Sequence, residues 1–139
     1  MSHVAMNIGA AAQAAGISAK MVRYYEEIGL MPQVPRSEGG YRTYSANDVH
    51  TLRFIRQARN LGFSLQQVAE LLNLWHDKNR SSSKVKALAL AHIADLDKRI
   101  RELNAMKDAL SNLASHCHGD DRCECPILDS IASHLGNRA

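Results

Sequence analysis

Three thiols, Cys117, Cys123 and Cys125, stand within nine residues of one another near the end of the 139-residue chain. The segment between them is charged, and Pro126 follows, which suits the first turn of a short helix over residues 127–135. The exposed N–H groups at such a helix start stabilise thiolates. Soft thiolates select Cu(I), Zn(II) and their heavier relatives. The spacing therefore predicts a metal site in this loop.

The residue types leave the number of ligands open. Cys117 and Cys125 suffice for a linear site that holds a monovalent d¹⁰ ion, and Cys123 is a possible third ligand. A closed four-ligand Zn(II) site would require a histidine, and only His116 and His118 lie close to the thiols. The alternative is three bystander thiols, although free cysteines usually lie in cores rather than in a charged loop.

Composition and cysteine count exclude several classes of protein. Apolar residues make up 45%, charged residues 22% and aromatic residues 5%, with a net charge of +3. This excludes a disordered chain, collagen and a disulfide-dense miniprotein. An odd number of clustered cysteines indicates reduced thiols in the cytoplasm. We expect no secretory signal and no membrane span. No nucleophile with a base and an orienting acid is evident, so we expect no enzyme.

A second chemically active set lies between residues 20 and 59, where seven basic residues stand against four acidic ones. Lys20, Arg23 and Tyr24 are spaced i, i+3 and i+4, so they share one face of a helix expected over residues 19–28. Such a face on the second helix of a helix-turn-helix suits the DNA major groove, where Arg23 could read a guanine edge. Tyr25 lies toward the apolar side of the same helix.

The segment of residues 31–44 has the composition of a hairpin, with Glu38-Gly39-Gly40 at its tip. Arg36, Tyr41 and Arg42 place basic and aromatic side chains together on it. Such a loop suits a wing that grips phosphates. Pattern alone leaves open a helical adaptor or a thiolate metal buffer that binds no DNA.

Helix signals predict a mainly α fold. Short helices over residues 8–15 and 19–28 surround the glycine at position 16, and capping boxes open helices at Ser45 and Ser64. After a polar hinge over residues 76–81, a helix is expected over residues 82–115. It carries a heptad seam, and a partner helix from a second copy would cover it, giving a homodimer. The seam comprises Ala89, Ile93, Leu96, Ile100, Leu103 and Leu110.

From these elements we expect the chain to consist of four parts. Residues 6–75 form a winged helix-turn-helix domain, residues 76–81 a hinge, and residues 82–115 an antiparallel coiled-coil helix. Residues 116–139 form the metal loop with its short helix.

Three stretches give this order of elements a resemblance to a known family. They are MVRYYEEIGL at residues 21–30, RSEGGYRTY at residues 36–44 and RQARNLGF at residues 56–63. With the thiol loop, the chain from Asn7 to Leu135 resembles the MerR family of transcriptional activators. Within that family, the loop is similar to that of the copper-efflux regulators, although they usually lack a counterpart of Cys123.

The resemblance implies a dimer on double-stranded promoter DNA with an overlong spacer. Metal binding would bend and undertwist the DNA and so align the promoter elements for RNA polymerase. The metal would be an effector without a catalytic role. By position, the recognition-helix contacts would be Lys20, Arg23 and Tyr25, the wing contacts Arg36, Tyr41 and Arg42, and a backbone contact Arg59.

The resemblance also assigns Cys117 and Cys125 as the metal ligands. Relatives that sense divalent metals place a cysteine from the other subunit near the start of the long helix, where this chain has Ser82. Without that third thiolate, the expected effector is Cu(I), with Ag(I) or Au(I) able to substitute. The alternative is a regulator of divalent Zn, Hg, Cd or Pb in which Cys123 or His118 joins the site.

Overall fold

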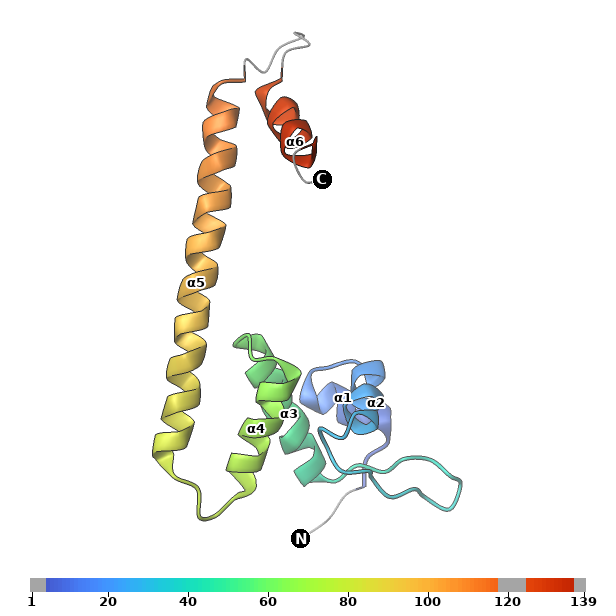
Figure 1. The fold of residues 1–139 in the computed structure, drawn as a ribbon. Coiled ribbons are helices and arrows are strands. Elements are labelled where there is room, and N and C mark those ends of the chain that lie inside the picture. The colour runs from blue at the N-terminus through green and yellow to red at the C-terminus, as the bar shows by residue number, and fades with distance from the viewer. Residues whose placement is uncertain (1–4, 118–124, 137–139) are drawn as a thin grey trace. The chain divides into compact units, whose positions relative to one another are not determined.

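The computed structural model describes residues 5–117 and 125–136, and within these ranges it contains six helices and no extended sheet (Figure 1). The chain forms two compact units, Met1–Val85 and Lys86–Ala139. The mainly α fold expected from the sequence is thus confirmed. His118 and Cys123, which the sequence marked as possible ligands, lie outside the described residues.

The helix-turn-helix consists of α1 (Ile8–Ala15) and α2 (Ala19–Glu27). Side-chain oxygens of Asn7 and Ser18 cap their first turns by accepting from backbone N–H groups at 2.8 and 3.1 Å. Gly16 ends α1 with φ of 77°, a left-handed conformation that glycine adopts without strain. The turn expected around this glycine is therefore present.

The helices α3 (Ala46–Asn60) and α4 (Leu65–His76) both begin with the capping boxes expected from the sequence. In α3, the Ser45 hydroxyl accepts from the Asp48 N–H, while the Asp48 carboxylate accepts from the Ser45 N–H at 2.8 Å. In α4, the Ser64 hydroxyl and the Gln67 amide are paired in the same way. These reciprocal bonds satisfy N–H groups that a helix start leaves unpaired.

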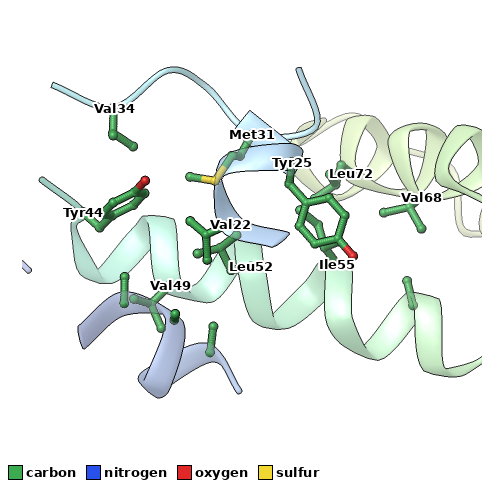
Figure 2. Close-up of a cluster of buried hydrophobic side chains, with 14 residues drawn as sticks. Val22, Tyr25, Met31, Val34, Tyr44, Val49, Leu52, Ile55, Val68 and Leu72 are labelled. Carbon is green, nitrogen blue, oxygen red and sulfur yellow. The ribbon is translucent and has the colours of Figure 1, made fainter. Parts of the chain in front are cut away.

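The core of the first unit lies where α1 packs against α2 and α3, and α3 against α4. Figure 2 shows apolar side chains from α2, α3, α4 and the hairpin segment meeting there. Among the largest that are fully buried are Val22, Met31, Tyr44, Leu52, Ile55 and Val68. Two of these, Met31 and Tyr44, come from the segment between α2 and α3. The core therefore holds both ends of that segment against the helices.

The segment between α2 and α3 is the expected hairpin. Backbone bridges pair Arg36 with Arg42, and Tyr44 with Met6. The Ser37 N–H donates to the Tyr41 carbonyl at 2.7 Å, and the Gly40 N–H closes the tip by donating to the Ser37 carbonyl at 2.9 Å. The hairpin is thus a wing beside the helix-turn-helix (Figure 1).

The long helix α5 runs over Ser82–Ser115, and α6 over Pro126–Gly136. The expected seam of α5 includes four residues that are between 52% and 62% exposed: Ile93, Ile100, Leu103 and Leu110. A single chain therefore leaves this apolar stripe open to solvent. Among the residues that the structure describes, no helix is long and apolar enough to cross a membrane.

Candidate nucleic-acid interface and thiol loop

A basic cleft of about 530 Å³ lies on the first unit, between the recognition helix α2 and the wing. Three arginines from two elements line it: Arg23 of α2, and Arg36 and Arg42 of the wing. Asn7 and Ile8, at the start of α1, form another part of its lining, with the positive end of the α1 dipole. The cleft therefore gathers positive charge in a shape that suits a phosphate backbone.

The wing presents Tyr41 and Arg36 in different ways. Tyr41 lines the cleft and is 74% exposed, so its ring is free to meet a ligand. The Arg36 guanidinium is exposed but tied at one nitrogen, since Nη1 donates to the Gly40 carbonyl at 2.8 Å. This bond spans the tip of the wing and holds one terminal nitrogen of the Arg36 guanidinium in place.

A buried carboxylate, that of Glu26, lies behind the cleft. Glu26 is on α2 and is only 7% exposed. Its Oε2 accepts from the Val34 N–H at 3.1 Å, and its Oε1 accepts from the Tyr44 hydroxyl at 3.2 Å. The same Oε1 forms an ion pair with Nε of Arg42 at 3.1 Å. One carboxylate thus joins the recognition helix to both sides of the wing.

Tyr44 shows the electrostatic effect of this arrangement. Its side chain is fully buried. Burial, together with the neighbouring Glu26 carboxylate, raises the pKa of Tyr44 from 10.0 to about 12, because both oppose a second negative charge. Arg42 and Arg23 act in the opposite direction. Tyr44 therefore stays a neutral hydrogen-bond donor well into the alkaline range.

The other expected DNA contacts lie outside the cleft. Lys20 is exposed on α2. Arg59, near the end of α3, donates through Nη1 to the Phe63 carbonyl at 2.8 Å. Tyr25 was expected as a contact, but the residue is only 5% exposed and its side chain packs in the core (Figure 2), which does not fit that role. Tyr24, 40% exposed, is the tyrosine that α2 presents to solvent.

Sequence reasoning counted Glu26 only as one acid among four, and so missed its role. A usable signal was present: Glu26 follows Val22 by four residues and adjoins Tyr25, which places it on the buried face of α2. A carboxylate on a buried face requires partners, since burying it alone is costly. That requirement could have pointed to the basic and tyrosyl side chains of the wing.

The two expected ligands Cys117 and Cys125 lie on either side of residues 118–124, which are outside the described structure. Both are free, half-buried thiols. Cys117 lies two residues after the last residue of α5, and its N–H donates to the Ala114 carbonyl at 3.1 Å. Cys125 directly precedes α6, and its carbonyl accepts from the Asp129 N–H at 3.0 Å. The helix termini hold the backbone of both cysteines, and two thiols are a donor set that fits a soft ion.

Ser82 is the first residue of α5 and is exposed. The preceding Ser81 supplies the local cap, since its hydroxyl accepts from the Ser83 N–H at 3.2 Å. The Ser82 side chain itself is in none of the hydrogen bonds described for this turn. The position is therefore open for a different side chain without loss of the cap.

The model of the "MerR HTH family regulatory protein" matches residues 6–75, and that of "MerR, DNA binding" matches residues 49–113. Heavy metal-dependent transcription regulator 2 of Rhizobium meliloti (strain 1021) is 57% identical over 128 residues, which cover 92% of this chain and 87% of the relative. The regulator CueR of Salmonella typhimurium is 42% identical over 134 residues, 96% of this chain and 97% of the relative.

A solved structure gives the same picture. The transcription regulator PbrR691 from Ralstonia metallidurans CH34, in complex with lead(II), superposes with a TM-score of 0.78 at 35% identity. The match covers 91% of this chain and 98% of that one. These relatives are regulators rather than enzymes, as expected for this chain.

Proposed function

The chain belongs to the MerR family of helix-turn-helix transcriptional regulators, and from this premise we propose that it is a dimeric activator of copper efflux or resistance genes that responds to Cu(I). Ag(I) and Au(I) substitute for Cu(I), because they too are soft monovalent d¹⁰ ions. Its similarity to regulators named for heavy metals and to CueR supports a metal effector. Its DNA target places it in the cytoplasm.

One observation favours a monovalent metal ion over a divalent one. The thiols available at the ends of the loop are Cys117 and Cys125, and the first residue of α5 is Ser82 rather than a third thiol. Two thiolates satisfy Cu(I), whereas Zn(II) prefers four ligands. The donor set thus favours a monovalent ion.

The proposed action on DNA follows from the two units. Arg23 reads base edges in the major groove of a promoter with an overlong spacer. The wing holds the phosphates through Arg36, Tyr41 and Arg42. The exposed seam of α5 pairs with that of a second copy, so two wings grip one promoter. Metal in the loop changes the dimer so that it bends and undertwists the DNA, and RNA polymerase then meets aligned promoter elements.

A reporter assay tests the metal site. Cys117→Ser and Cys125→Ser should each abolish activation by copper while leaving DNA binding by the metal-free protein intact, because both residues lie far along the chain from the first unit. Cys123→Ser is the matched control and should respond to copper as the wild type does. Normal copper activation by Cys125→Ser would contradict the proposal.

A second candidate is a regulator of divalent metals, which the similarity to the lead(II) complex of PbrR691 favours. In that case Cys123 or His118 would complete the site. Ser82→Cys separates the two candidates: if the site is built for two thiolates, this added thiol should raise the response to Zn(II), Hg(II) or Pb(II). Ser83→Cys, one residue further along the helix, is the control. A wild type that already responds to a divalent metal as strongly as Ser82→Cys would support the second candidate.

A further inference from the structure

The buried carboxylate of Glu26 has a role beyond stability. We propose that Glu26 is a positioning residue for DNA binding, which acts by holding the Arg42 guanidinium in the orientation that meets a phosphate. The inference rests on the DNA-binding part of the proposed function and is independent of the metal.

The geometry of Arg42 supports this role. Its Nε is buried and forms an ion pair with Oε1 of Glu26 at 3.1 Å, a contact that lacks the geometry of a hydrogen bond, while the side chain as a whole is 25% exposed. The exposed part therefore belongs to other atoms of the side chain, and Arg42 lines the basic cleft. The charge contact at Nε holds that end of the planar guanidinium beside Glu26, and so restricts where its two terminal nitrogens can lie.

Glu26 also fixes the wing on which Arg42 stands. Its second oxygen accepts from the Val34 N–H, just before the first side of the hairpin, and the Tyr44 hydroxyl reaches it from the second side. The carboxylate belongs to α2, the helix that carries Arg23. Glu26 thus connects the helix that carries Arg23 to the segment that carries Arg42. Preorganised side chains lose less entropy on binding, so this anchoring favours affinity.

Arg36 provides a matched comparison within the same hairpin. It is the bridge partner of Arg42 and lines the same cleft, but its guanidinium bonds to the Gly40 carbonyl. Removing the Glu26 charge should therefore disturb Arg42 and leave the Arg36 anchor intact. This difference separates a positioning effect from a general loss of wing structure.

A double-mutant cycle on metal-free protein tests the proposal. The probe is a random-sequence 30-base-pair duplex, since phosphate contacts are independent of sequence, and binding is measured over a range of salt concentrations. In the wild-type background, Arg42→Ala should weaken DNA binding about tenfold at low salt. It should also make the plot of log binding constant against log salt concentration less steep, by about 0.9. In the Glu26→Gln background, the same change should weaken binding less than about twofold. Arg36→Ala should cost the same in both backgrounds.

The outcomes are distinct. An equal cost of Arg42→Ala with and without Glu26→Gln would show that Glu26 has only a structural role, and would overturn the proposal. Coupling of Glu26→Gln to Arg36→Ala as strong as its coupling to Arg42→Ala would overturn it too. A wild type that does not bind the duplex would instead contradict the DNA-binding part of the proposed function.

Arg42→Lys covers the case in which Glu26→Gln does not fold. Lysine keeps the charge, but its single ammonium cannot pair with Glu26 and present a second fixed donor to the cleft. It should bind DNA nearly as weakly as Arg42→Ala, in a protein whose circular dichroism spectrum is that of the wild type. Binding by Arg42→Lys at the wild-type level would overturn the proposal.

Discussion

The Tyr44 hydroxyl donates a hydrogen bond to Oε1 of Glu26 at 3.2 Å, so a phenol at the end of the wing is bonded to a carboxylate on the recognition helix. Both side chains are buried. The pair explains why a polar tyrosine can occupy the centre of an apolar core: its single donor is satisfied there. It also makes the joint between wing and helix sensitive to alkaline pH.

We predict that Tyr44→Phe lowers the free energy of unfolding by about 1–2 kcal/mol at pH 7, because a hydrogen bond to a charged acceptor is lost. The wild type should also lose stability as pH rises from 10 toward 12. The reason is that the folded-state pKa of about 12 exceeds the ordinary value of 10.0, so its contribution is complete below pH 10 and disappears above the folded pKa. Urea denaturation at several pH values measures both effects.

Tyr41→Phe is the control for this experiment. Tyr41 lies on the same wing but is 74% exposed. Removing its hydroxyl group should therefore leave both the stability and the alkaline transition unchanged. If Tyr44→Phe lost stability at alkaline pH just as the wild type does, the alkaline transition would not come from Tyr44.

Two glycines of the helix-turn-helix should respond oppositely to alanine. Gly16 has φ of 77°, and a Cβ there would lie 3.1 Å from the Arg56 guanidinium. Gly16→Ala should therefore destabilise the protein by about 1–2 kcal/mol. Gly9 lies within α1, and a Cβ there meets only an ordinary contact at 3.5 Å. Gly9→Ala should stabilise by about 0.4–1 kcal/mol. Thermal unfolding of the two variants measures both; a stabilising Gly16→Ala would refute the turn geometry.

DNA affinity should distinguish the recognition helix from the wing. Arg23→Ala should cost about 1–3 kcal/mol at the specific site and relax the preference for that sequence. Arg23 is suited to this role because it is exposed on α2 and lines the cleft. Binding to the promoter and to unrelated duplexes, measured at several salt concentrations, checks this. An equal loss of affinity for every sequence would make Arg23 a phosphate contact instead.

Charge on the α5 seam should break the dimer. Leu103 is 62% exposed in the single chain, and Leu103→Glu would put two like charges into the apolar interface of a two-fold pair. We expect the dimer dissociation constant to rise more than tenfold. Arg101→Glu introduces the same side chain off the seam and should leave the dimer intact. Sedimentation velocity distinguishes dimer from monomer; an unchanged dimer with Leu103→Glu would contradict the seam.

Local signals explain how much of the fold could be predicted. Capping boxes at Ser45 and Ser64 and the glycine at position 16 act within one helical turn, so they set helix ends before any packing occurs. The bounds of α1 and α5 follow from such signals. The wing was predictable as a hairpin because its glycine tip is also local.

Contacts between distant residues could not be predicted in the same way. Glu26 and Tyr44 are eighteen residues apart, and only the packing of the wing against α2 brings them together. The role of Tyr25 was ambiguous because neighbouring tyrosines on a helix face different directions, and burial decides between them.

The most direct test of the central claim is a competition titration of the reduced protein. Cu(I) and Zn(II) are each offered against a chelator of known affinity, with wild type and Cys123→Ser. The two-thiolate site formed by Cys117 and Cys125 predicts very tight Cu(I) binding, weak Zn(II) binding and no effect of Cys123→Ser. Comparable Zn(II) binding, or a large loss of Cu(I) affinity in Cys123→Ser, would contradict it and establish a site of three or four ligands.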